Sequence, residues 1–290
     1  MISPLRVLHQ GPVLGALVRA GLLARQKGAS MPELPGPVLQ ATVAPRPPAL
    51  LADFVRWSGG DPAAWRTRVP PLLFPQWGFP LLSRTLAGIP YDLTRVMNAG
   101  CTVERKADLP AGEPLELTAR LVSIDDNGER ALITQELVTG TARVPDALRV
   151  LVRAFVPLQR KGDRTKEKPR VPDDATPIAT RRLPAGAGLD FALLTGDFNP
   201  VHWIGPWARA AGFPRPILHG FGTLAIAAEA VDRVVFSGRA GAWSSLEARF
   251  SRPVVLPAEL EVFVRPSDGG LWVGAAPGGP AYLVGGFTRG

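Results

Sequence analysis

The chain has 290 residues, of which 46% are hydrophobic and 20% are charged, and its formal net charge is +8. This length gives room for two domains of ordinary size, and the apolar content excludes an intrinsically disordered chain. The single cysteine, Cys101, excludes an intramolecular disulfide and a cysteine-based metal cluster. With only three histidines in the chain, no metal site is predicted.

No run of about 18 uninterrupted apolar residues occurs, so the sequence predicts no transmembrane helix. The first residues are apolar with scattered arginines, but they lack a compact charged segment followed by a signal-peptide cleavage site. Pro12 to Gln26 instead predicts an amphipathic helix lying on the fold, with contact to a membrane surface as the alternative. A cytoplasmic location is the resulting expectation.

The first half of the chain predicts helices followed by an antiparallel sheet. Residues 1–48 supply the amphipathic helix and a proline-rich connector. Further helices are expected over residues 50–57 and over residues 81–86, the latter as the core helix of a first unit. Apolar and polar residues then alternate, as in half-buried antiparallel strands, over residues 116–126, 129–140 and 147–158.

A charged stretch from Gln159 to Pro172 predicts an exposed linker between two copies of one unit. The repeat is visible where PAGEPLEL, from Pro110 to Leu117, is closely similar to LPAELEV, from Leu256 to Val262. The predicted units are residues 49–158 and residues 173–290. Strands of the second unit are expected over residues 243–254, 259–266, 270–277 and 281–289.

Residues with catalytic potential gather in the second unit, where six residues contain Asp197, Asn199 and His202. Gly196 and Pro200 do not suit the interior of a helix or strand, so this segment is expected to be an ordered, rigid loop. A carboxylate and a nearby imidazole can share a water molecule, one group deprotonating or orienting it and the other moving the second proton. Asp and Asn also cap turns and helices, which is the structural alternative.

Further along, Ile217-Leu218-His219-Gly220 leads into an apolar run, Phe221 to Val231, that predicts a buried helix. The N–H of Gly220 would lie at the positive end of this helix and could polarise a carbonyl oxygen. His219 is expected to pack or hydrogen-bond near the helix start.

These segments resemble the signature of the MaoC-like, hydratase-2 family, which is a small residue, G-D-x-N-P-x-H, A-x-x-x-G-F and I-x-H-G. The matching segments here are Thr195 to His202, Ala208 to Phe213 and Ile217 to Gly220. Many relatives carry an acidic residue two positions after the histidine, where this chain has Ile204. That departure puts loop contacts in doubt rather than the chemistry.

The resemblance implies an α+β protein with two tandem hotdog units, each an antiparallel sheet wrapped around a central helix. It also implies reversible hydration of trans-2-enoyl thioesters to (R)-3-hydroxyacyl thioesters, with no metal or redox cofactor. In that reaction Asp197 and His202 would activate the water. Asn199 would orient the water, and Gly220 would bind the thioester carbonyl. Substrate contacts are expected from Phe198, Pro200, His219, Phe221 and Trp77.

The acyl carrier is expected to be coenzyme A or an acyl-carrier protein. Coenzyme A carries phosphates and acyl-carrier proteins are usually acidic, so either suits a basic chain, although a solvated arginine-rich surface would also account for the charge. No RNA-binding signature or zinc-finger spacing occurs, so no nucleic-acid partner is predicted. A homodimer is one expected assembly. Two other functions stay open: an acyl thioesterase on the same fold, and a non-catalytic subunit that binds acyl thioesters.

The first unit is predicted to be non-catalytic. Its Asp61 has no imidazole partner, and Pro75-Gln76 is expected where the second unit has His219-Gly220. The aromatic residues of the first unit either shape an acyl tunnel or pack as ordinary core. They are Trp57, Trp65, Phe74, Trp77 and Phe79.

Overall fold

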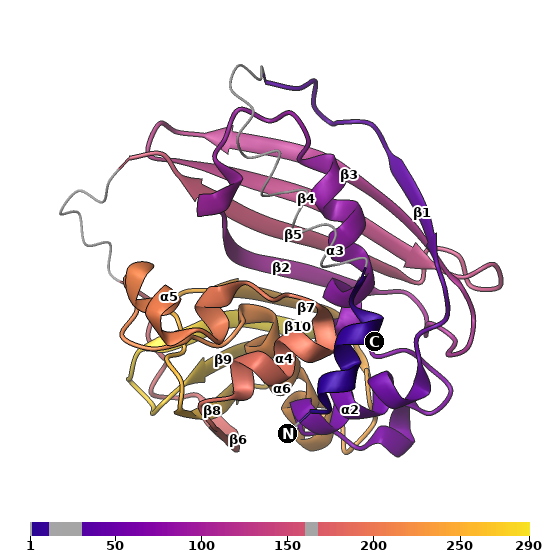
Figure 1. The fold of residues 1–290 in the computed structure, drawn as a ribbon. Coiled ribbons are helices and arrows are strands. Elements are labelled where there is room, and N and C mark those ends of the chain that lie inside the picture. Colours follow the sequence, from indigo (N-terminus) through magenta and orange to yellow (C-terminus); the bar gives the residue numbers. More distant parts are fainter. Residues whose placement is uncertain (1, 12–30, 160–167) are drawn as a thin grey trace.

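The computed structural model describes residues 2–11, 31–159 and 168–290. Within these residues ten strands form one antiparallel sheet in the order β1-β3-β4-β5-β2-β7-β10-β9-β8-β6 (Figure 1). The strands are β1 Leu39–Val43, β2 Met97–Arg105, β3 Leu115–Asp126, β4 Arg130–Gly140, β5 Leu148–Pro157, β6 Thr176–Leu183, β7 Trp243–Phe250, β8 Ala258–Arg265, β9 Gly270–Gly274 and β10 Ala281–Arg289. The α-helices are α2 Pro48–Ser58, α3 Phe74–Thr85, α4 Ala187–Thr195, α5 Gly205–Ala210 and α6 Gly220–Val234. Short 3-10 helices are η1 Pro4–His9, η2 Pro62–Trp65, η3 Pro71–Leu73, η4 Leu93–Arg95 and η5 Pro200–His202.

The order of elements repeats on either side of the β2–β7 pair. The first unit runs β1, α2, α3 and then β2 to β5, and the second runs β6, α4, α6 and then β7 to β10. Strands β2 and β7 pair from Gly100 opposite Arg249 to Glu104 opposite Ser245, so the two units share one continuous sheet. This architecture is the double hotdog that the family resemblance implied.

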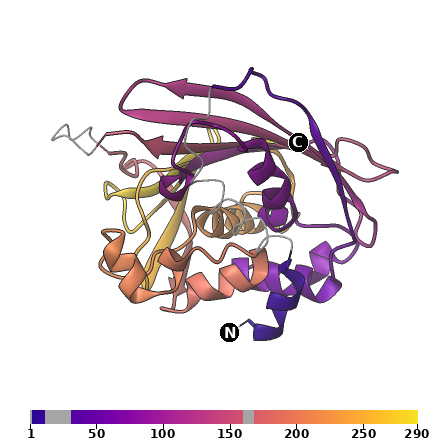
Figure 2. The same ribbon diagram turned by 45° about the horizontal axis from the view of Figure 1, so that its top comes forward.

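The curved sheet encloses the two central helices, α3 and α6. Figure 2 shows α6, the tan-orange helix near the centre, with the sheet on one side and α2 and α4 on the other. Leu224, Ala227 and Val231 of α6 are fully buried. At Gly222 a Cβ would lie 2.9 Å from the Trp57 ring, so α2 packs against α6 at a distance that only glycine permits. One hydrophobic core therefore runs through both units.

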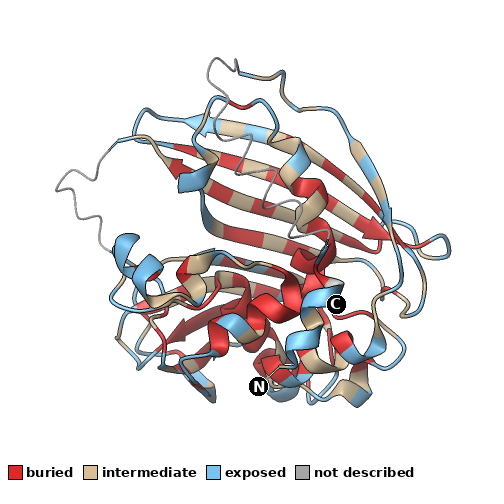
Figure 3. Cartoon of the chain, viewed as in Figure 1, coloured by how far each residue is buried: buried red, intermediate tan, exposed pale blue. Residues whose placement is uncertain are grey.

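Alternation of buried and half-buried residues explains most of the strands. In β5 the residues Leu148, Val150 and Val152 are buried while those between them are half-buried, and Figure 3 shows the same pattern along β3 and β4. The predicted strands of both units are confirmed, although β7 and β9 end earlier, at Phe250 and Gly274.

Three strands and the start of one helix differ from the predictions. β1 lies inside the predicted proline-rich connector and pairs with β3, which extends the first sheet. β2 and β6 lack a regular apolar alternation, so periodicity does not reveal them. Helix α3 begins at Phe74 rather than Leu81, because Pro75 fits its first turn and Pro80 is tolerated within it.

The predicted amphipathic helix from Pro12 to Gln26 lies outside the described residues, as do residues 160–167 of the predicted linker. Among the described residues, no helix has the length and apolar character needed to cross a membrane. The boundaries of the predicted units stay a prediction.

Gly100 permits the close approach of β2 to β7. Its φ is +152°, and a Cβ would lie 2.0 Å from the carbonyl oxygen of Ala248. We expect Gly100→Ala to lower the free energy of unfolding by about 2–4 kcal/mol, measured by urea unfolding, because strain and overpacking add. Gly112→Ala is the control, since Gly112 has φ +84° and open space around it, and should cost about 1 kcal/mol. Equal losses would contradict the role of the close approach.

Candidate active site

The candidate site lies where α4 ends and turns into a short loop. Gly196 closes α4 with φ 82° and ψ 1°, a left-handed conformation that glycine adopts without strain. Asn199 then starts η5, and its side-chain oxygen accepts the N–H of Val201 at 3.3 Å. The end of α4 at Gly196 and the start of η5 at Asn199 fix the loop that carries Asp197 and His202.

His202 ends η5 and is half-buried. Its Nδ1 lies 2.8 Å from the carbonyl oxygen of Ile217. Because a carbonyl only accepts hydrogen bonds, Nδ1 carries the proton, and Nε2 of the neutral ring keeps a free lone pair. Burial lowers the pKa of His202, while the charge of Asp197 acts in the opposite direction. His202 is thus poised as a neutral base.

His219 occupies the N-cap position of α6, where its side chain is buried. Its Nε2 lies 2.9 Å from the main-chain oxygen of Asp197, so Nε2 is protonated and donates. The ring stacks on His202, with centroids 3.5 Å apart. Burial, together with the neighbouring His202, lowers the pKa of His219 well below its usual 6.5. In the structure His219 contacts the loop that carries Asp197, and its predicted contact with substrate stays a prediction.

Asp197, His202 and His219 form one cluster, in which one ligand-type atom from each lies within 4.8 Å of the others. Such a set could surround a metal ion. However, the Nε2–H of His219 donates a hydrogen bond to the main-chain oxygen of Asp197, so this nitrogen offers no lone pair to a metal unless that hydrogen bond breaks. The arrangement suits acid–base chemistry, because a carboxylate and a neutral imidazole share one small space.

Gly220 opens α6, and N–H groups in the first turn of a helix have no partner within the helix. Its N–H is therefore able to meet a carbonyl oxygen. A Cβ at Gly220 would lie 2.6 Å from the ring of Phe250, so glycine is required there. Phe221 lies edge-on to Phe250, Phe74 and Phe79, with centroids 5.3–5.6 Å apart. Two of these rings belong to α3, so the first unit contributes to the apolar surroundings of the helix start.

The other predicted site residues divide into two groups. Phe198 and Pro200 lie in the loop between Asp197 and His202, while Asn199 is exposed and uses its side-chain oxygen as the cap of η5. The amide nitrogen of Asn199 stays available for the predicted orienting role. Trp77 is buried in the first unit, where its Nε1 donates to Thr139 of β4 at 3.2 Å. The structure gives Trp77 a packing role and does not bring it into the cluster.

Equivalent hydrogen bonds locate the counterpart of Gly220 in the first unit. In each unit a backbone N–H just before the central helical segment donates to a carbonyl oxygen further along the chain. The residue after this donor is the N-cap of the segment. By this criterion Pro71 stands in the place of Gly220, so the expectation that Pro75-Gln76 lies there is wrong. The extra turn η3 precedes α3 and causes the shift. Since Pro71 has no N–H, the first unit lacks a donor at the position of Gly220. The equivalent bonds are Leu218 N–H to Val254 O and Val69 N–H to Leu109 O.

The loop of the first unit has lost its imidazole as well. Asp61 caps η2 by accepting the N–H of Ala63 at 2.9 Å, as Asn199 caps η5. Counting from this cap, Ala64 stands at the position of His202. The missing N–H at Pro71 and the missing imidazole at Ala64 both support the prediction that the first unit is non-catalytic.

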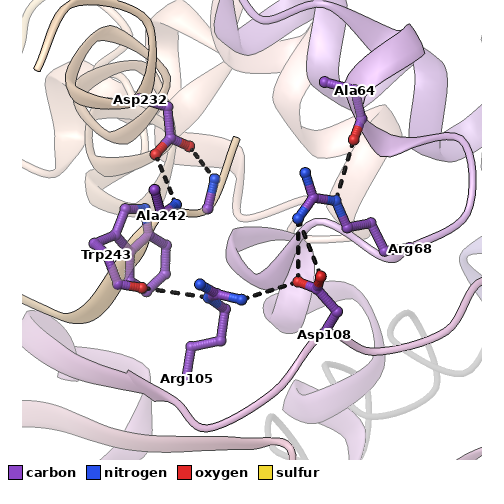
Figure 4. Close-up of polar contacts among 8 residues, drawn as sticks. Ala64, Arg68, Arg105, Asp108, Asp232, Ala242 and Trp243 are labelled. Carbon is purple, nitrogen blue, oxygen red and sulfur yellow. Dashed lines mark hydrogen bonds and ion pairs between the residues drawn. The ribbon is translucent and has the colours of Figure 1, made fainter. Parts of the chain in front are cut away.

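Ion pairs and a cavity occupy the counterpart region of the first unit. Asp108 binds Arg68 at 3.1 Å and Arg105 at 2.9 Å (Figure 4). A cavity of about 260 Å³ is lined by residues of the η2 loop together with Glu229 and Asp232 of α6. Asp232 accepts the N–H groups of two residues before β7, which ties the end of α6 to the sheet.

Two residues outside the sequence predictions hold α4 and its loop. Gln10 is fully buried, and its Nε2 donates to the carbonyl oxygens of Leu193 at 2.9 Å and Leu194 at 3.0 Å. At Gly188 a Cβ would lie 1.9 Å from the carbonyl oxygen of His202. Gln10 leaves no local signal because it acts across the sequence, whereas a glycine inside a helical segment is a usable sign of close packing.

Known proteins are similar to this chain in sequence and in fold. Residues 164–271 match the family described as MaoC like domain. The chain is 34% identical over 182 residues to the enoyl-CoA hydratase ChsH3 of Mycobacterium tuberculosis, covering 59% of this chain and 61% of that protein. It is 32% identical over 160 residues to the 3-hydroxyacyl-thioester dehydratase Y of the same organism, covering 51% and 54%. The matches thus span about half to three fifths of these relatives.

The likeness to solved structures extends over most of the chain. The MaoC-like dehydratase from Phytophthora capsici superimposes with a TM-score of 0.72 at 19% identity, covering 89% of this chain and 96% of that one. At this level of identity the likeness establishes the fold alone.

Glu229 offers a pH-dependent test of how α6 packs against the first unit. A Cβ on Gly60 would lie 2.2 Å from its carboxylate oxygen, and burial with the charge of Asp232 raises the pKa of Glu229 to about 8 from 4.5. The folded protein therefore keeps a proton that the unfolded chain has released, so the contribution to stability is full below pH 4.5 and is lost as the pH rises towards 8. We expect Glu229→Gln to flatten this fall, measured by urea unfolding at several pH values.

The pKa of Asp232 is raised to about 6, so a smaller slope below that pH should persist in Glu229→Gln. Glu247→Gln, at an exposed position on β7, is the control and should keep the slope assigned to Glu229. A slope in Glu229→Gln equal to that of the parent protein would contradict the buried carboxyl.

Proposed function

We propose, from the premise that residues 164–271 form a MaoC-like domain within a double hotdog fold, that the protein reversibly hydrates trans-2-enoyl thioesters to (R)-3-hydroxyacyl thioesters. One observation carries the proposal. The carboxylate of Asp197 lies close to neutral His202, in the unit whose central helix begins at Gly220. The names of the two curated relatives, a hydratase and a dehydratase, describe the two directions of such a reaction.

The thioester carbonyl is bound by the N–H of Gly220 at the positive end of α6. Withdrawal of electrons towards this oxygen makes C3 of the enoyl group electrophilic and stabilises the enolate formed when water adds. The water lies between Asp197 and Nε2 of His202. His202 takes a proton from the water as the water oxygen bonds to C3. Asp197 or His202 then returns a proton to C2. Dehydration follows the same path in reverse.

Coenzyme A is the carrier to test first, and an acyl-carrier protein is the alternative, since both suit the net charge of +8. A single chain already supplies both hotdog units through the β2–β7 pair, so the site does not require a second copy of the chain. The cytoplasmic location and a homodimer stay predictions.

Asp197→Asn and His202→Ala should each lower kcat by about 10²–10⁴-fold with little change in Tm, because this is the contribution of general acid–base catalysis. The assay is the loss of enoyl-thioester absorbance with crotonyl-CoA and with a long-chain enoyl-CoA. Asp61→Asn is the matched control, since it makes the same change in the equivalent loop of the first unit, and it should retain full activity. Near-normal turnover in either test variant would contradict the acid–base roles proposed for Asp197 and His202.

A thiol-release assay and a binding assay separate the other two functions. Release of free thiol from acyl-CoA, without loss of the alkene, would favour an acyl thioesterase. Binding of acyl-CoA that is unaffected by Asp197→Asn, with no turnover of any kind, would favour a non-catalytic subunit.

The acid limb of kcat/KM should lie below pH 6.5. His202 acts in its neutral form, and burial lowers its pKa from 6.5. Activity should therefore fall only as the pH drops below this value, measured with crotonyl-CoA between pH 5 and 8. A limb centred above pH 6.5 would contradict the role given to His202.

A further inference from the structure

The ring of His219 is enclosed between two other rings. It stacks on His202 with centroids 3.5 Å apart and an interplanar angle of 25°, and it contacts Phe191 with centroids 4.8 Å apart. Its side chain is 2% exposed. His219 therefore touches the acid–base pair directly while having almost no contact with solvent.

The polar contact of His219 is to the residue that carries the carboxylate. Its Nε2–H donates to the main-chain oxygen of Asp197 at 2.9 Å, and Nε2 lies 3.8 Å from Oδ2 of the same residue. This hydrogen bond starts from the N-cap of α6, which is anchored in the core. The positions of Asp197 and of His202 thus both depend on one ring.

Packing alone does not account for an imidazole at this place. The Nδ1 of His219 is buried and has no hydrogen-bond partner among the described residues. A buried acceptor without a partner is costly, and a phenylalanine would stack on His202 without that cost. What the imidazole adds is the Nε2–H that reaches Asp197.

We propose that His219 is a positioning residue for the acid–base pair, holding Asp197 through its Nε2–H and the His202 ring through stacking. This inference rests on the proposed hydratase function and deepens it. The ring has to stay neutral, because a cation against the face of His202 would oppose its uptake of a proton from water. Burial keeps it so by lowering the pKa of His219.

Two substitutions separate the two contacts. His219→Phe keeps a stacked ring and removes the N–H, whereas His219→Asn keeps an amide donor and removes the ring. We expect kcat with crotonyl-CoA to fall about 10- to 100-fold in each, with KM changed by less than about twofold, because displaced catalytic groups slow the chemistry. The acid limb should move to higher pH in His219→Asn, since removal of the ring admits water to His202.

Gln135→Leu is the matched control for the loss of a buried hydrogen bond. Gln135 is buried in the first unit, and its Nε2 donates to the main-chain oxygen of Leu82 at 2.7 Å. This variant should lower Tm and leave kcat unchanged. Full kcat in His219→Phe, or an equal loss of kcat in Gln135→Leu, would overturn the inference.

Imidazole ¹⁵N NMR tests the inference without turnover, because the chain has only three histidines. We expect the Nδ1–H tautomer for His202 and the Nε2–H tautomer for His219. A His202 signal that shifts or becomes a tautomer mixture in His219→Asn supports the positioning role, and a His202 spectrum unchanged in both variants overturns it. If the parent protein hydrates no enoyl-CoA while the spectra behave as expected, the proposed function fails and the positioning of His202 stands.

Discussion

Helix α6 has to be buried on nearly all of its sides, and the packing that achieves this places the candidate site. The sheet covers one side of the helix, while α2 and α4 cover the other. Because β2 pairs with β7, the two units cannot separate without exposing the shared core. The first residue of α6, Gly220, is thereby held at a fixed place beside the loop that leaves α4. A donor that has to meet a carbonyl oxygen gains from such rigidity, since preorganised dipoles need no rearrangement during the reaction.

A gradient of burial assigns the roles within the cluster. His219 is 2% exposed and serves as an inner support, whereas the side chain of Asp197, at 15% exposed, lies nearer to the solvent. Desolvation keeps both imidazoles neutral, and their carbonyl partners decide which nitrogen carries the proton. His202 therefore donates through Nδ1 and keeps its lone pair on Nε2, whereas His219 donates through Nε2. Two identical side chains in contact with each other thus adopt opposite tautomers, each fixed by its own carbonyl partner.

The first unit keeps the architecture of the second unit without the groups that form the candidate site there. Pro71 removes the N–H donor and Ala64 replaces the imidazole, while the cap at Asp61 and the course of the backbone persist. In place of the missing groups, the first unit has ion pairs of Asp108 with Arg68 and Arg105. The unit still serves the second one, because α3 supplies aromatic rings around Phe221 and α2 packs on α6.

Much of this protein was determined by its sequence alone. Period-two alternation revealed the longer strands, the repeat revealed two units, and the spacing of Asp197, Asn199 and His202 with His219-Gly220 predicted the members of the site. Periodicity did not reveal β1, β2 and β6, whose place depends on pairing with distant strands. Only the tertiary structure decided that His219 stacks on His202, that Pro70-Pro71 rather than Pro75-Gln76 stands in place of His219-Gly220, and that Gln10 supports α4. The physical reason is that ring stacking, desolvation and long-range hydrogen bonds arise from residues far apart in the chain, whereas local patterns record only which side of an element is buried.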